Sequence, residues 1–175
     1  MDRRWRHTQA VAERATAMAP SVPEPDRPAL VAAAWLHDVG YADPVRASGF
    51  HPLDGARHLL SRTWPVQVAG LVAHRSGARF VAAVRGLAAP LRPFDLRRFA
   101  IGPVADALTT ADQTTGPDGC PVDVEDRFTE MLARHGAGSP QARVHAIRAP
   151  ALRAAVRRTN RRLAEAVTRP SDGTG

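Results

Sequence analysis

The residues best suited to chemistry in this chain are the adjacent pair His37 and Asp38, which directly follow the apolar run at 32–36. An imidazole or a carboxylate that is buried without a partner is costly, so this pair needs a specific reason to end an apolar helix. Both side chains are good ligands for divalent transition metals. Other residues of these two types are spaced along the chain and are candidate partners: His7, His51, His74 and Asp112.

The elements that must position these side chains are predicted to be helices. Ala-rich segments carry apolar residues every three or four positions, and β-branched alternation with hairpin turns is absent. Helices are expected at about 3–18, 26–40, 51–60, 65–77, 79–89, 95–114, 123–135 and 151–167, with another starting at 139–140. Gly102 and Pro103 should interrupt or kink the helix at 95–114, and residues 116–121 should form a turn. The predicted fold class is all-α, a compact bundle with each candidate ligand near the end or on the inner face of a helix.

Length and composition indicate one domain. A chain of 175 residues can bury a core without disulfides, and we expect a single domain at 1–169 with a disordered tail at 170–175. Cys120 is the only cysteine, so no intrachain disulfide can form, which fits a reducing cytoplasm. No segment is typical of a signal peptide or a membrane span. We therefore expect a cytoplasmic protein that does not bind membranes.

The net charge of +7 is concentrated near the C-terminus. Residues 141–175 contain eight arginines and two acidic residues, whereas the earlier residues contain 16 arginines and 15 acidic residues. The body of the domain is therefore nearly neutral. A solvated basic helix face is the simpler interpretation, and nucleic-acid binding is not expected.

The candidate ligands and their neighbours resemble the HD-domain superfamily, which is named for an adjacent His-Asp metal motif. His37 and Asp38 match the motif within AWLHDVGY, His7 matches the first metal histidine, and Asp112 matches the last aspartate within LTTAD. The segments GFHPLDGA and VAHRSGA are similar to those of small bacterial HD-domain proteins described as phosphohydrolases. The resemblance covers nearly the whole chain and implies a helical bundle of the HD-domain type.

This resemblance implies a metal centre with one or two divalent ions drawn from Mn, Fe, Co, Ni and Zn. In that family one metal is held at the positions that match His7, His37, Asp38 and Asp112. A subset of members holds a second metal, bridged by the motif aspartate, at the positions that match His51 and His74. Many relatives have another histidine at the next position, where this chain has Arg75. This departure would place the Arg75 guanidinium beside the metals, where it could bind a substrate phosphate, and a surface or salt-bridging residue is the alternative interpretation of Arg75.

The function implied is that of a metal-dependent phosphohydrolase. Its partner would be a small phosphomonoester or phosphodiester, with nucleotides among the candidates. The metal would lower the pKa of bound water and polarise the phosphoryl group. Asp38 would be the catalytic residue, because it would ligate the ion and orient the attacking water.

Two other functions fit the same residues. Some HD-domain proteins with this ligand set hold two irons and cleave a substrate oxidatively. A non-catalytic domain that senses a nucleotide is the other alternative. Individual residues also have structural interpretations: a buried polar pair for His37 and Asp38, a surface histidine for His7, a salt bridge with an arginine for Asp112, and helix-terminal histidines for His51 and His74.

Overall fold

The computed structural model describes residues 2–94 and 96–168, and the regular elements in this part of the chain are helices. The only β pairing among these residues is an isolated bridge between Thr115 and Pro121. The all-α fold class is therefore confirmed. The predicted tail at 170–175 lies outside the described residues. The α-helices are α1 (Arg3–Ala17), α2 (Arg27–Leu36), α3 (His51–Ser61), α4 (Val66–His74), α5 (Ala78–Val84), α6 (Leu96–Phe99), α7 (Pro103–Gln113), α8 (Val124–His135), α9 (Pro140–Arg143) and α10 (His145–Thr168).

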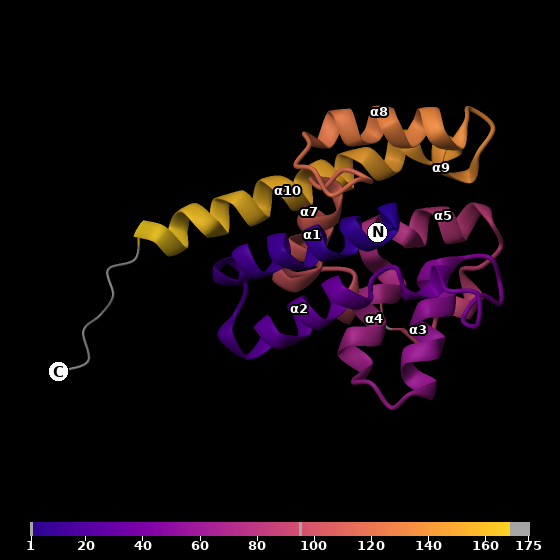
Figure 1. Cartoon of the computed structure of the whole chain (residues 1–175), viewed down its shortest axis with the longest axis horizontal. Coiled ribbons are helices and arrows are strands. Elements are labelled where there is room, and N and C mark those ends of the chain that lie inside the picture. The colour runs from indigo at the N-terminus through magenta and orange to yellow at the C-terminus, as the bar shows by residue number, and fades with distance from the viewer. Residues whose placement is uncertain (1, 95, 169–175) are drawn as a thin grey trace.

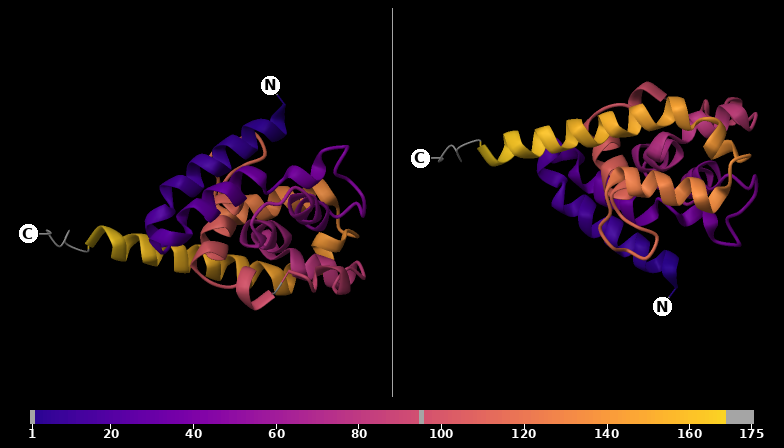
Figure 2. Two further views of the ribbon diagram at one scale, coloured as in Figure 1. Left: turned by 90° about the horizontal axis from the view of Figure 1, so that it is seen from below. Right: turned by 90° about the horizontal axis from the view of Figure 1, so that it is seen from above.

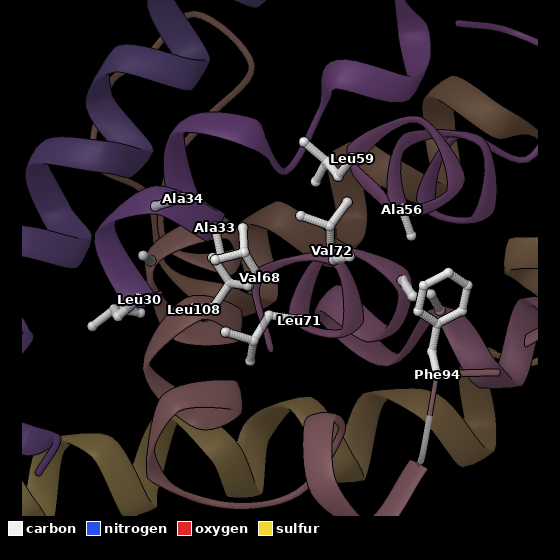
Figure 3. Packing of buried hydrophobic residues seen from close by; sticks show 14 of the residues in the cluster. Leu30, Ala33, Ala34, Ala56, Leu59, Val68, Leu71, Val72, Phe94 and Leu108 are labelled. Atoms are coloured by element: carbon white, nitrogen blue, oxygen red, sulfur yellow. The ribbon is translucent and has the colours of Figure 1, made fainter. Parts of the chain in front are cut away.

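The main core lies where α2, α4 and α7 meet. Leu30 of α2, Val72 of α4 and Leu108 of α7 are each almost completely buried and belong to one hydrophobic cluster, part of which Figure 3 shows. Alanines on α2, including Ala33 and Ala34, are also fully buried. Such small side chains let helices approach closely while the larger residues fill the space between them. Packing α1 and α7 onto α2 brings their polar residues to one end of this core.

The C-terminal helix α10 runs along α7, and its end projects beyond the rest of the bundle (Figures 1 and 2). Two of its arginines bind Asp106, a carboxylate of α7 that is only 4 % exposed: Arg158 at 2.5 and 2.8 Å and Arg162 at 2.9 Å. Two charges of the basic C-terminal helix therefore neutralise a carboxylate inside the fold, because a buried carboxylate needs a cationic partner. In the described part of the chain, no helix has both the length and the apolarity needed to cross a membrane.

Some helix boundaries differ from the predicted ones. The helix expected at 79–89 ends at Val84, and the helix expected from about 151 begins at His145. Pro150 lies inside α10, and the helix continues through it because Arg148, Ala149 and Leu152 are buried on both sides of the proline. Tertiary packing thus overrides the local cost of proline. The predicted interruption at Gly102 is confirmed, since α7 begins at Pro103.

The predicted extension of the second helix to Gly40 is wrong. Helix α2 ends at Leu36, and residues Val39–Tyr41 form a 3₁₀ turn, η3, that packs against the start of α3. A Cβ atom on Gly40 would lie 2.0 Å from the His51 carbonyl oxygen and 2.7 Å from the Gly55 backbone nitrogen. Only glycine allows this approach, which fixes Asp38 and His51 next to each other.

Replacing Gly40 by alanine should lower the free energy of unfolding by about 2–3 kcal/mol, because the added methyl group would push η3 away from α3. Urea unfolding monitored by circular dichroism measures this change. Gly138 is the matched control, because no heavy atom lies within 4 Å of a Cβ at that position. Equal effects of Gly40→Ala and Gly138→Ala would contradict the packing account.

Candidate metal centre

Three of the predicted ligands form a cluster in which potential metal-binding atoms lie within 4.8 Å of one another: His7, His37 and Asp38. His7 comes from the buried face of α1, and the other two follow the last residue of α2. Asp112 of α7 adjoins them, because its Oδ1 lies 3.3 Å from Nε2 of His7. Four residues that span more than half of the chain are thus brought together by the packing of α1, α2 and α7.

The geometry of His37 fits a metal ligand. Its Nδ1 lies 2.7 Å from the Ala34 carbonyl oxygen, and since a carbonyl only accepts, Nδ1 carries the proton. Burial lowers the pKa of His37 and keeps the ring neutral, so Nε2 presents a lone pair. That Nε2 is buried, has no hydrogen-bond partner among the described residues and lies 3.6 Å from Oδ1 of Asp38. A buried acceptor without a donor is unusual, and a metal ion would satisfy it.

His7 is oriented in the same manner. Its Nδ1 donates to the Gly116 carbonyl oxygen over 2.9 Å, which leaves Nε2 directed at Asp112. Burial lowers the pKa of His7, but its hydrogen bond with Asp112 and the attraction of that carboxylate outweigh burial and raise it. Metal-binding histidines commonly donate their second ring nitrogen to a backbone carbonyl, which fixes the tautomer. Both His7 and His37 show this arrangement.

Arg75 lies between the two aspartates. The backbone leaves the helical conformation after His74, and Ser76 has a φ of 47°, so the Arg75 side chain turns inward. Its Nη1 donates to Oδ2 of Asp112 over 2.8 Å, and its Nη2 donates to Oδ1 of Asp38 over 2.5 Å. Ser76 also donates to Asp112, with an Oγ to Oδ2 distance of 2.5 Å. The predicted salt bridge between Asp112 and an arginine is thus present beside the histidine contact.

The charge of Arg75 controls the ionisation of both carboxylates. Burial raises the pKa of Asp38, but His37, when it is protonated, and Arg75 outweigh burial and lower that pKa to about 2. Because burial keeps His37 neutral near pH 7, Arg75 is the group that supplies positive charge to Asp38 at this pH. Burial likewise opposes ionisation of Asp112, and Arg75 and His7 hold its pKa well below the ordinary value. The Asp38 charge therefore stabilises the fold above pH 3.8, and this contribution is lost as the pH falls toward 2.

Of the remaining two predicted ligands, His51 borders the cluster, whereas His74 lies outside it and outside the cavity lining. The His51 ring is stacked on Tyr41 with a centroid distance of 3.8 Å, and its Nε2 accepts a hydrogen bond from Arg75 and lies 4.0 Å from Oδ1 of Asp38. Burial and the nearby Arg75 charge keep the pKa of His51 well below its ordinary value. His74 is buried at the end of α4, and its Nε2 donates to the Phe94 carbonyl oxygen over 2.8 Å.

A cavity of about 360 Å³ opens onto this cluster. Its lining includes four of the predicted ligands and two neighbouring residues: His7, Asp38, His51, Asp112, Tyr41 and Ser76. Two residues of the C-terminal helices also face it, Arg127 and Arg148. The sequence did not point to these two arginines, because their neighbouring residues do not distinguish them from the other arginines of the chain.

The chain was compared with protein-family models, curated proteins and solved structures, and none of them matches it. The HD-domain resemblance therefore stays a prediction that depends on the motif residues and their context.

Replacing Arg75 by methionine should destabilise the metal-free protein by about 3 kcal/mol, because two buried carboxylates would lose their cation. Adding Mn²⁺ should recover a larger share of stability in this variant than in the unchanged protein, since a divalent ion can replace the guanidinium. Urea unfolding at pH 7, after chelator treatment and again with Mn²⁺, measures both effects. Arg46→Met is the control, because the exposed Arg46 side chain contacts Asp43 and the Tyr41 carbonyl oxygen but neither Asp38 nor Asp112.

Proposed function

We propose that this protein is a metal-dependent phosphohydrolase of the HD-domain type that cleaves a phosphomonoester or phosphodiester, with nucleotides among its candidate substrates. The observation that carries the proposal is the buried Nε2 of His37. It faces Asp38 and has no hydrogen-bond partner among the described residues. The adjoining cavity supplies room and positive charge for a phosphate ester.

The residues that would hold the ion are His7, His37, Asp38 and Asp112. This set of two imidazoles and two carboxylates suits Mn, Fe, Co, Ni or Zn. When bound, such an ion lowers the pKa of a water ligand and polarises a phosphoryl oxygen.

Arg75 supports a centre with one ion. Its guanidinium already lies between Asp38 and Asp112 and donates to His51, so these side chains already share a fixed positive charge. A second metal ion beside the guanidinium would be repelled by it. The di-iron oxygenase alternative needs two ions and is therefore less well supported than hydrolysis.

Asp38 would orient the attacking water by accepting a hydrogen bond from it. With a pKa of about 2, its carboxylate is ionised near neutral pH and is a weak base, so orientation is a better role for it than proton removal. Arg75 binds Oδ1 of Asp38, and Arg4 lies beside the other carboxylate oxygen, with its Nη1 3.6 Å from Oδ2. Arg4 and Arg75 would stabilise negative charge that develops on the phosphoryl oxygens.

Protein loaded separately with Mn, Fe, Co, Ni or Zn should hydrolyse at least one member of a panel of phosphomonoesters, phosphodiesters and nucleotides. His37→Asn and Asp38→Asn should each reduce kcat/KM at least about 100-fold, because a catalytic metal supplies several kcal/mol of transition-state stabilisation. Release of phosphate or of the alcohol product measures the rate.

His58→Asn is the matched control. This histidine is half-buried on α3, away from the cluster, and its replacement should leave kcat/KM within about twofold. Failure of every metal form to turn over any member of the panel would contradict the proposed hydrolysis. Nucleotide-dependent thermal stabilisation without turnover would favour the sensing alternative.

A further inference from the structure

The cavity beside the metal centre carries more positive than negative charge. Among the described residues that line it, there are six arginines and three aspartates. Two of the aspartates, Asp38 and Asp112, are already bound to Arg75 and belong to the proposed metal site. The other arginines therefore leave an excess of positive charge along the rest of the wall.

Arg148 of α10 is the most constrained of these arginines. It is 9 % exposed, and within the described residues it forms no salt bridge with any carboxylate. Its Nε donates to the Ser76 carbonyl oxygen over 2.9 Å, and its stem packs on Gly77, where an added Cβ would come within 3.3 Å of Cγ. The side chain is thus fixed in place while its terminal Nη groups have no hydrogen-bond acceptor among the described residues.

Arg127 of α8 adds a second buried guanidinium to the same wall. It is also 9 % exposed, and although it pairs with Glu130, its Nε is buried without a partner among the described residues. Burial lowers the pKa of Arg148 to about 10, attraction to Asp112 opposes this, and repulsion from Arg75 and Arg127 adds to it. Arg75, Arg127 and Arg148 line the same cavity, and an anion bound there would relieve the repulsion between their charges.

We propose that Arg148 and Arg127 form an anion subsite that holds a second phosphate group of the substrate, so that preferred substrates carry at least two phosphates. Guanidinium groups match phosphate oxygens with paired, charge-assisted hydrogen bonds. One phosphate would lie at the metal centre and the other at the C-terminal wall of the same cavity. This substrate class rests on the proposed hydrolase function, whereas the anion subsite itself can be tested without it.

Binding of methylenebisphosphonate, a pyrophosphate analogue that cannot be hydrolysed at its bridging carbon, tests the subsite in chelator-treated protein. Isothermal titration at 0.15 M salt should show saturable binding, because this ionic strength screens contacts with exposed arginines. Arg148→Gln should weaken binding about tenfold to a hundredfold, and Arg148→Lys should restore part of it. Arg157→Gln, on the exposed face of α10, should leave affinity unchanged within about twofold.

Equal affinity of the unchanged protein and Arg148→Gln, or the absence of saturable binding, would overturn the subsite. Circular dichroism checks that each variant is folded. If Arg148→Gln does not fold, Arg127→Gln provides the same comparison and should also bind the bisphosphonate about tenfold more weakly.

Kinetics separate this inference from the proposed function. With a diphosphate ester and a monophosphate ester of the same alcohol, Arg148→Gln should raise KM about tenfold or more for the diphosphate and leave the monophosphate values unchanged. An equal loss for both esters would contradict a second phosphate site. If neither ester is hydrolysed, the hydrolase proposal fails, and the titration still decides whether the anion subsite exists.

Discussion

Two aspartates, the buried Asp112 and the partly buried Asp38, lie where α1, α2 and α7 meet, and both need positive charge nearby. An ionised carboxylate out of water is stable only with cations or hydrogen-bond donors around it. Arg75 supplies the fixed charge, since its two Nη groups reach Asp38 and Asp112 at the same time. Two backbone features hold the charged side chains together. The chain leaves helical geometry at Ser76, next to Arg75, and Gly40 lets the turn after Asp38 pack closely on α3.

The histidines complete this charge balance without adding a fixed charge. His7 and His37 each donate Nδ1 to a backbone carbonyl, so each ring turns Nε2 toward the carboxylates. At His37 this leaves an imidazole lone pair next to the Asp38 carboxylate, an arrangement that suits a divalent ion. The same cavity continues to Arg148, whose position on α10 adds charge that the buried aspartates do not neutralise. The proposed chemistry and the proposed substrate class therefore follow from one distribution of charge.

The helices could be predicted from the sequence because apolar periodicity is a local pattern. The grouping of His7, His37 and Asp112 was expected from the resemblance to HD-domain proteins, and it depends on the packing of helices far apart in the sequence. The direction of Arg75 could not be predicted, since it depends on a left-handed residue at Ser76 and on two carboxylates from other helices. The start of α10 was also missed, because its burial against the rest of the fold outweighs Pro150. Arg148 lies 72 residues from the carbonyl that it binds, a contact that no motif specifies.

Metal content is the measurement that tests the central claim most directly. Elemental analysis of protein purified without chelator, or reloaded with Mn, Fe, Co, Ni or Zn, should find one divalent ion per chain. The ion should be lost when His37 is replaced by alanine and retained when His58 is replaced. Protein that stays metal-free under all these conditions would contradict a metal centre at His7, His37, Asp38 and Asp112. Two ions per chain would contradict the role assigned to Arg75.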